Sequence, residues 1–502
     1  MDDRFLSEIA AADSELEARY ASKLITNGDL DRKLVSFQAN KKETGSRWFK
    51  YREGFSSALI RYILTEAGVT SGPLLDPFAG SGTSLFTAAA AGIDSVGIEL
   101  LPSSIEGIDV RRSMLAVDQL DLAAEIIDFA SSRSWERPGG REDFRHVPIT
   151  AGAFPAETEG FLGRFLWDAR RVSNPILFRV LRYAAMCVLE EISFTRKDGQ
   201  YLRWDYRSGR TLGKRRFDKG RIAGFSDAIL SKLYDIASDL APIEHGNGLQ
   251  GSLMAESRDE SLMATIELHP GSCFDVMPRC EPDSFGAIVT SPPYCNRYDY
   301  TRTYALELAF MGLSSTDILS LRQTMLSCTV ENRPKSELAS MVDPTMFEEA
   351  SRAWRTQPLL TLTLEYLNYC KRMKTLNNPG IPRMVENYFA EMSVVIFEAA
   401  RILRNGAPFV MVNDNVRYQG AHLPVDLIMS EIAVTAGFEV DAIWVLPVGK
   451  GNSSQQMGIH GRQELRKCVY IWRRTNRPRQ IYRHAHSDGL VPVLASQSET
   501  NH

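Results

Sequence analysis

Apolar and polar residues follow patterns along this chain that predict strands alternating with helices. Short apolar runs at 285–290, 407–413, 440–448 and 467–473 predict buried strands, and helix-like spacings of apolar residues lie between them. Two more strands are predicted at Leu74–Asp76 and Ser95–Glu99. Strands that alternate with helices predict an α/β fold with a doubly wound, mostly parallel sheet.

The length of the chain predicts more than one simple domain. With 502 residues, it should form two domains or one core with large insertions. Residues 1–45 are predicted to be helical, because apolar and charged residues mix at helix-like spacing from Leu16 to Lys42. Segments 101–262 and 312–383 are too long for plain loops and are predicted to be inserted elements. The core then comprises 46–100, 263–311 and 384–474, followed by a polar tail at 475–502.

Composition narrows the class of protein. A hydrophobic content of 44% and a charged content of 24% are typical of a soluble globular protein. No apolar stretch reaches the roughly 18 residues of a membrane span, and no secretory signal is present, which predicts a cytoplasmic protein without a membrane partner. Seven cysteines without a C-x-x-C pair argue against a disulfide framework and against a metal site. Because the net charge is −4, nucleic-acid binding would require a local basic patch.

A glycine-rich turn follows the first predicted strand. The run reads Leu74-Leu75-Asp76-Pro77-Phe78-Ala79-Gly80-Ser81-Gly82-Thr83 and continues into an alanine-rich helix. Gly80 and Gly82 let the backbone approach a ligand, because no side chain intervenes. The crevice between such a strand and helix is where open α/β sheets bind nucleotides.

Two details favour S-adenosyl-L-methionine over a dinucleotide at this turn. Asp76 would repel a pyrophosphate but can pair with a cationic amino group. The G-x-G-x-x-G fingerprint is also incomplete, because its last position is Leu85. Glu99 lies 23 residues after Asp76, about the spacing at which an acid reaches ribose hydroxyls. The alternative is an ordinary glycine turn with a solvated acid.

A second run, Thr290-Ser291-Pro292-Pro293-Tyr294, ends another apolar strand. The two prolines fix the backbone and leave carbonyl acceptors at the strand tip. An exocyclic amine is a poor nucleophile, because its lone pair is delocalised into the ring. Hydrogen bonds from this amine to the Ser291 hydroxyl and the Pro292 carbonyl would localise the lone pair, and Tyr294 could stack on an extruded base. The alternative is a surface turn or a proline-rich ligand.

Basic and aromatic residues gather between these two runs. Residues 196–221 hold ten Lys or Arg against three Asp. We expect phosphate and base contacts from Arg203, Trp204, Arg207, Arg210, Lys214, Arg215 and Arg216. The alternative is a solvated basic hairpin. A second arginine cluster at 473–483 favours a soluble terminus, and Asn413-Asp414-Asn415 suits a target pocket or a turn equally.

Together, Asp76-Pro77-Phe78-Ala79-Gly80-Ser81-Gly82-Thr83 and Thr290-Ser291-Pro292-Pro293-Tyr294 resemble the cofactor and catalytic motifs of the DNA amino-methyltransferases, which modify cytosine N4 or adenine N6. Their order resembles the family branch that inserts target recognition between the motifs. The resemblance covers about 45–100 and 265–474. It implies a Rossmann-like methyltransferase fold with S-adenosyl-L-methionine as cofactor and double-stranded DNA as partner. A cognate restriction or defence system stays an open possibility.

The resemblance also implies roles for individual residues. It gives catalytic positions to Ser291, Pro292, Pro293 and Tyr294. It gives cofactor contacts to Tyr51, Phe55, Ser56, Asp76, Pro77, Phe78, Gly80, Gly82, Thr83 and Glu99, with Asp76 on the methionine amino group and Glu99 on the ribose.

Serine before the prolines resembles the cytosine-N4 members more than the adenine-N6 members. No Pro-Cys dipeptide occurs in the chain, which argues against ring-carbon methylation through a thiolate. Two other functions stay open: a transfer-RNA guanine amino-methyltransferase, and a catalytically silent nucleic-acid-binding subunit.

Overall fold

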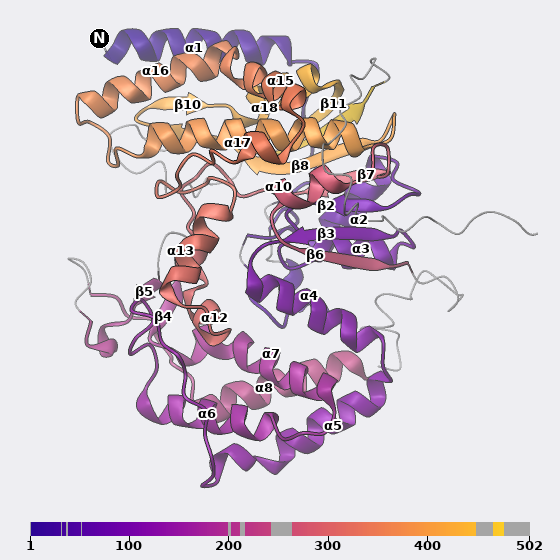
Figure 1. Cartoon of the computed structure of the whole chain (residues 1–502), viewed down its shortest axis with the longest axis vertical. Helices are drawn as coiled ribbons and strands as arrows, with labels where there is room; N and C mark the ends of the chain where they lie inside the picture. Colours follow the sequence, from indigo (N-terminus) through magenta and orange to yellow (C-terminus); the bar gives the residue numbers. More distant parts are fainter. Residues whose placement is uncertain are drawn as a thin grey trace, which may run out of the picture.

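A central sheet of eight strands organises the molecule (Figure 1). The computed structural model describes residues 2–31, 33–36, 39–51, 53–198, 202–210, 216–241, 264–447 and 465–475. The sheet strands are β1 (Leu24–Thr26), β2 (Leu74–Asp76), β3 (Ser95–Glu99), β6 (Ile266–Pro270), β7 (Ala287–Thr290), β8 (Pro408–Asp414), β11 (Phe438–Val445) and β12 (Lys467–Arg474). Their order across the sheet is β1-β11-β12-β8-β7-β2-β3-β6. Only β12 runs antiparallel to its neighbours β8 and β11, so the expected mostly parallel α/β sheet is confirmed.

Side chains of the strands alternate between two apolar layers. Leu75, Ile288 and Phe409 join the core under α17 (Ile381–Ile402) and α18 (Val425–Ala436). Leu74, Val289 and Val410 face the opposite way and join the core under α2 (Ser57–Glu66) and α3 (Thr83–Ala90). Because strand side chains point to opposite faces in turn, these apolar runs need a helical cover on both faces of the sheet.

The strand order reverses at the β2–β7 pair. From β2 the chain proceeds outward through β3 and β6, whereas β7 leads the other way through β8. Open α/β sheets bind ligands at such a point, outside the carboxyl ends of the strands. The two runs that carry candidate chemistry lie at the carboxyl ends of β2 and β7, the two strands at which the order reverses.

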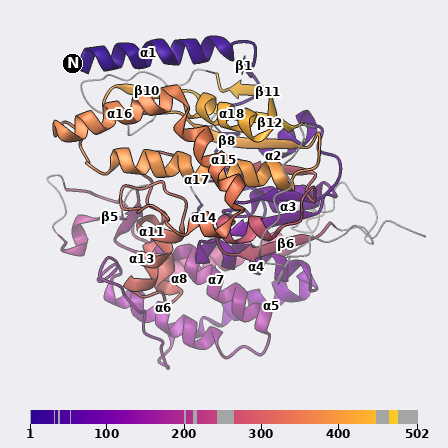
Figure 2. The ribbon, with the colours of Figure 1, turned by 45° about the horizontal axis from the view of Figure 1, so that its top comes forward.

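The N-terminal residues differ from the predicted helix. The helix α1 (Asp2–Arg19) ends well before Lys42, and the chain then turns into β1, which pairs in parallel with Ile443–Val445 of β11. The helix-like spacing after Leu16 was therefore misleading, because three residues of this segment complete the edge of the sheet. Figure 2 shows α1 lying along the same side of the molecule as α16 (Pro358–Arg372), against which it packs.

A helical body lies below the sheet in Figure 1. It contains α4 (Pro102–Leu115), α5 (Gln119–Ser132), α6 (Ala156–Ala169), α7 (Pro175–Ile192) and α8 (Phe225–Leu240). Its apolar core is continuous with α12 (Ala305–Phe310) and includes buried Trp135 and Phe165. A two-stranded hairpin of β4 (Thr195–Lys197) and β5 (Leu202–Trp204) extends from the end of α7. The boundaries of the expected insertion at 101–262 stay a prediction.

The second expected insertion, 312–383, is helical in the structure. It contains α13 (Ser315–Thr324), α14 (Leu338–Met341), α15 (Pro344–Arg355) and α16. Here α15 packs on α17, and α16 packs on both α17 and α1. The residues after α13 lead back toward the carboxyl edge of the sheet. No helix among the described residues has the length and apolar character that crossing a membrane requires.

Candidate active site

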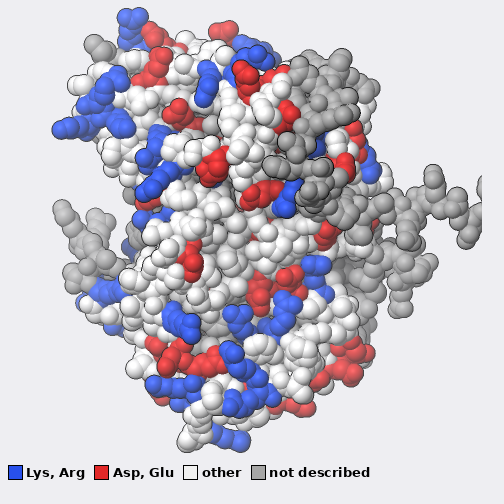
Figure 3. Space-filling model, in the orientation of Figure 1, with Lys and Arg blue, Asp and Glu red and all other residues white. Residues whose placement is uncertain are grey.

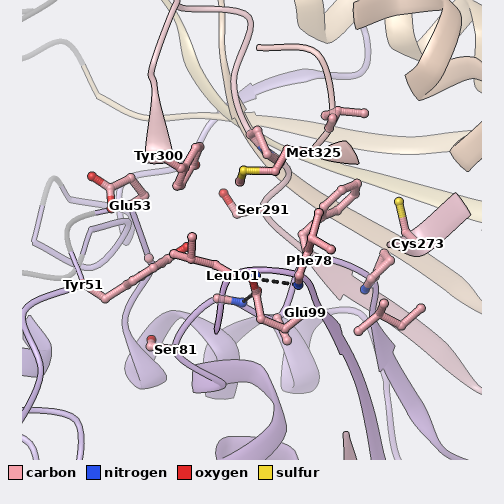
Figure 4. Close-up of a pocket in the computed structure, with 18 of the residues that line it drawn as sticks. Tyr51, Glu53, Phe78, Ser81, Glu99, Leu101, Cys273, Ser291, Tyr300 and Met325 are labelled. Atoms are coloured by element: carbon pink, nitrogen blue, oxygen red, sulfur yellow. Dashed lines mark hydrogen bonds between the residues drawn. The ribbon is translucent and has the colours of Figure 1, made fainter. Parts of the chain in front are cut away.

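An open pocket of about 730 Å³ lies at the carboxyl ends of β2, β3, β6 and β7 (Figure 4). The pocket is lined by Tyr51, Glu53, Gly54, Phe55, Pro77, Phe78, Ala79, Gly80, Ser81, Thr83, Ile98, Glu99, Leu100, Leu101, Gly271, Ser272, Cys273, Ser291, Pro293, Tyr300, Met325 and Leu326. The structure therefore brings residues of the predicted cofactor run, Asp76–Thr83, and of the predicted catalytic run, Thr290–Tyr294, to one cavity.

The glycine-rich turn depends on two backbone conformations that favour glycine. Gly80 and Gly82 have φ angles of 55° and 76°. A Cβ atom on Gly82 would also lie 2.9 Å from Cγ1 of Ile108 in α4. Gly82 therefore allows α4 to pack directly against the start of α3, and Gly80 and Thr83 remain on the pocket wall.

Asp76 lies beneath the turn and does not line the pocket. Its side chain is 1% exposed. One carboxylate oxygen accepts hydrogen bonds from the Thr290 hydroxyl at 2.6 Å and the Phe78 N–H at 3.1 Å, and the other accepts from the Ser84 hydroxyl. Burial raises the pKa of Asp76 to about 6, and these hydrogen bonds limit the rise. Asp76 thus ties the cofactor turn to the catalytic strand.

Glu99 lines the pocket at the end of β3. Its carboxylate accepts N–H groups from Gly80 at 2.6 Å, Leu101 at 2.7 Å and Leu100 at 3.0 Å. Burial raises the pKa of Glu99 to about 7, against the lowering effect of these three hydrogen bonds. Each oxygen of a carboxylate has two lone pairs, so capacity to accept one ligand hydroxyl remains, on Oε2.

The segment before α2 supplies another wall. Tyr51 and Phe55 line the pocket as expected, whereas Ser56 is fully buried and caps α2 by accepting the Leu59 N–H at 3.1 Å. Ser56 therefore makes no contact with the pocket, because its hydroxyl is occupied within the protein. Glu53 was not singled out from the sequence, although it lines the pocket and accepts hydrogen bonds from the hydroxyls of Tyr298 and Tyr304.

The catalytic run follows β7 directly and contributes to the wall of the pocket. Ser291 and Pro293 line the cavity, whereas Pro292 and Tyr294 are not among its lining residues. The Ser291 hydroxyl donates to the Tyr294 hydroxyl at 3.2 Å, and burial raises the pKa of that phenol. Figure 4 shows Ser291 between Tyr300, Met325 and Phe78. Tyr300, Met325 and Leu326 escaped sequence reasoning, because they belong to segments without a recognisable pattern.

The charge of the pocket wall selects against phosphate ligands. The lining includes the carboxyl groups of Glu53 and Glu99, and among the residues that the structure describes it includes no Lys or Arg. Among these described side chains, a pyrophosphate would meet two carboxyl groups and no cation. A ligand with a sulfonium, an ammonium group and ribose hydroxyls suits this donor and acceptor set, and the Tyr51 and Tyr300 rings could face the cation.

The expected nucleic-acid-binding arginines that the structure describes contact other groups of the protein. Arg207 forms a two-pronged ion pair with Asp205, and Arg210 donates to the carbonyls of Pro148 and Ala151 while it stacks on Trp204. Trp204 is 6% exposed, so stacking on a base is not open to it in this conformation. The guanidinium of Arg203 stacks on Phe217, and that of Arg216 on the exposed Tyr206. Lys214 and Arg215 lie outside the described residues.

Other polar positions that the sequence left open have structural partners. The Asn413 side chain is buried and donates to the Tyr388 hydroxyl, and Arg474 is buried and donates to the carbonyls of Ala400 and Gly437. Arg473 pairs with Asp441. No group of three or more His, Cys, Asp or Glu within the described part of the chain could hold a metal ion.

Comparison with known proteins identifies the family. The chain is 46% identical over 473 residues to the Type II methyltransferase M.AvaI of Nostoc sp. and, equally, of Anabaena variabilis, covering 94% of this chain and 95% of each relative. It is 39% identical over 482 residues to the Type II methyltransferase M.BsoBI of Geobacillus stearothermophilus, covering 91% of both chains. The chain belongs to the Type II methyltransferases.

The methyltransferase match extends beyond the sheet. Because it covers 94% of the chain, it takes in the helical body and α13–α16 as well as the pocket. No family model and no solved structure matches this methyltransferase. The placement of its side chains in the pocket therefore rests on the geometry described above.

Proposed function

We propose that this chain transfers a methyl group from S-adenosyl-L-methionine to the exocyclic amino group of a base flipped out of double-stranded DNA, with cytosine N4 favoured over adenine N6. One observation carries the proposal: Ser291, which follows the Thr290 that is hydrogen-bonded to Asp76, lines a pocket whose described walls hold carboxylates and no cations. The relatives' designation as Type II methyltransferases supports methyl transfer.

The proposed cofactor contacts follow the pocket wall. Glu99 would accept a ribose hydroxyl, and Phe78 and Leu101 would flank the adenine. Because Glu53 lines the pocket and Asp76 does not, we assign the methionine ammonium to Glu53 and a positioning role to Asp76. When bound, the cofactor supplies an activated methyl group on a sulfonium.

The catalytic work of the protein is to orient the amine. The Ser291 hydroxyl and the Pro292 carbonyl would each accept a hydrogen bond from the target amine. These two hydrogen bonds would direct the lone pair of the amine nitrogen toward the methyl group. Preorganised acceptors of this kind lower the barrier without a covalent intermediate. Tyr294, behind Ser291, would support the flipped base after a small side-chain movement.

Ring-carbon methylation is disfavoured by the state of the nearby thiols. Cys273 lines the pocket and Cys295 follows the catalytic turn, but both are buried. Burial raises the pKa of both thiols, so neither supplies the thiolate that this chemistry requires. Serine before the two prolines is the feature that favours cytosine N4.

The substrate class is tested by offering duplex DNA and transfer RNA separately with methyl-labelled cofactor. We expect label in DNA. Label in transfer RNA alone would overturn the assignment, and cofactor binding without transfer to either would point to a silent binding subunit. The packing of α1 and β1 into the core argues against an N-terminal RNA-binding module in these residues. We further expect a cognate restriction enzyme as partner.

A further inference from the structure

A second groove, of about 1010 Å³, lies beside the cofactor pocket. The two cavities share one segment of chain, because Arg47, Trp48, Phe49 and Lys50 line the groove whereas Tyr51 and Glu53 line the pocket. The other groove walls come from the end of α7, the hairpin strand β4, residues 219–221 and α8. Figure 1 shows these elements together in the helical body.

The lining of this groove is strongly basic. It contains seven Lys or Arg, namely Arg47, Lys50, Arg196, Lys197, Lys219, Arg221 and Lys232, against Glu190 and Glu191. The whole chain has a net charge of −4, so this concentration of positive charge is local. On the face shown in Figure 3, the visible Lys and Arg side chains are interspersed with Asp and Glu.

Some of these cations build the groove, and others remain at its surface. Lys197 forms a buried 2.7 Å ion pair with Glu307, and the Lys219 ammonium donates to the Ser193 carbonyl at 2.6 Å and to the Glu190 carbonyl at the end of α7. Arg47 pairs with Asp239. These contacts fix the floor and one wall.

Three cations of the groove have exposed side chains. Arg196 is exposed, Lys50 is 51% exposed and lies 3.3 Å from Glu190, and Arg221 is 81% exposed and lies 3.9 Å from Asp227. The Arg221–Asp227 pair is exposed at both partners, and such pairs contribute little to stability. Arg221 can therefore exchange its partner for phosphate oxygens at little cost, and the exposed Arg196 and Lys50 side chains lie in the same groove.

We propose that this groove binds the phosphodiester backbone of duplex DNA beside the target base, with Lys50, Arg196 and Arg221 as phosphate contacts. The inference rests on the proposed function for the choice of DNA. It places the phosphate contacts on Lys50 and on the two ends of the basic segment 196–221, instead of on Arg207 and Arg210, whose guanidinium groups are bound to other groups of the protein. Since Lys50 directly precedes Tyr51, a backbone held in the groove lies next to the cofactor pocket.

The test is the salt dependence of binding to a short duplex of mixed sequence, measured by fluorescence anisotropy without cofactor. Each phosphate contact contributes about 0.9 to the slope of log affinity against log salt concentration. The triple variant Lys50→Gln/Arg196→Gln/Arg221→Gln should therefore lower the slope by about 2.7. The matched control Lys371→Gln/Arg372→Gln/Lys374→Gln removes three exposed charges from the end of α16 and the turn after it, and should leave the slope unchanged.

The double variant Arg196→Gln/Arg221→Gln leaves the Lys50–Glu190 pair intact and guards against a folding defect in the triple variant. Its slope should fall by about 1.8. An unchanged slope in both variants, or an equal loss in the control, overturns the groove. Stronger binding of transfer RNA than of duplex, lost in the variants, overturns the choice of DNA. If the wild type methylates DNA but the variants bind the duplex with the wild-type slope, the groove is refuted and the proposed function is not. If the variants lower the slope but the wild type methylates no DNA, the proposed function is refuted and the groove is not.

Discussion

The Thr290 hydroxyl donates a 2.6 Å hydrogen bond to the Asp76 carboxylate, across 214 positions of sequence. This bond joins the ends of β2 and β7, the two strands at which the order of the sheet reverses. The cofactor turn and the catalytic turn are therefore parts of one hydrogen-bonded unit. Their relative position should depend on this contact.

Replacing Thr290 with valine keeps the shape of the side chain and removes the donor to Asp76. A buried acceptor that loses its partner costs roughly 1–3 kcal/mol of stability. We expect Thr290→Val to lower the free energy of unfolding by that amount, measured by chemical denaturation, and to reduce kcat. Thr435→Val on the exposed face of α18 is the control and should change neither. Equal free energies of unfolding for Thr290→Val and Thr435→Val would show that the Thr290–Asp76 hydrogen bond does not stabilise the protein.

Replacing Ser291 with alanine removes one proposed acceptor for the target amine. A lost hydrogen bond to the transition state of about 1.5–3 kcal/mol corresponds to a kcat reduction of roughly 10- to 100-fold. Cofactor affinity, measured by isothermal titration calorimetry, should change little, because the pocket keeps its carboxylates. Full activity of Ser291→Ala would remove Ser291 from the mechanism.

Cofactor affinity should depend on pH through Glu99. The pKa of this carboxyl is raised to about 7 in the cofactor-free protein by burial. The ionised form is the better acceptor for ribose hydroxyls and the better partner for a cationic ligand. We expect the Kd for S-adenosyl-L-methionine to increase as the pH falls through 7, and Glu99→Gln to bind weakly with a flatter pH profile. The same steep profile in both proteins would exclude Glu99 as its source.

The Glu99 carboxyl should also make the stability of the cofactor-free protein depend on pH, with lower stability at higher pH. Its folded-state pKa of about 7 exceeds the ordinary value of 4.5, so the folded state binds more protons between these values. The contribution of Glu99 to stability should therefore decrease as the pH rises from about 4.5 to 7. Comparing the wild type with Glu99→Gln by thermal unfolding at several pH values measures this difference, which should be largest above pH 7. A constant difference across the range would contradict the raised pKa.

The buried pair of Lys197 and Glu307 links the hairpin to the wall of the pocket. Both side chains are at most 2% exposed, and the Lys197 ammonium lies 4.3 Å from the ring centre of Tyr304, whose hydroxyl donates to Glu53. Lys197→Met leaves a buried unpaired carboxylate and should cost roughly 3–5 kcal/mol in unfolding free energy. Lys197→Met/Glu307→Gln should recover most of this loss. A double variant no more stable than the single one would argue against a pairwise effect.

Local patterns in the sequence predicted the strands and turns that form the site. The turns at Gly80 and Ser291 follow apolar strands, and β8 and β12 appear close to their expected bounds, because such strands have a strong local signal. The edge strand β1 was not predicted. Its three residues have no clear pattern of their own, and their partners in β11 lie more than 400 positions away.

Side-chain orientation accounts for the other differences at the site. Asp76 and Ser56 were expected to contact cofactor, yet both side chains are turned inward. Asp76 accepts a hydrogen bond from Thr290 of the other motif, and Ser56 accepts one from the Leu59 N–H at the start of α2. Glu53 faces the pocket, because Tyr298 and Tyr304 hold it there from another segment. Such long-range contacts cannot be read from the spacing of residues in one stretch of sequence.

The position of the transferred methyl group tests the central claim most directly. Duplex DNA treated with the enzyme and methyl-labelled cofactor would be digested to nucleosides and analysed by mass spectrometry. The account predicts label on cytosine N4, greatly reduced in Ser291→Ala. Label on adenine N6 would retain the mechanism and change the base, whereas label on a ring carbon of cytosine would contradict the account.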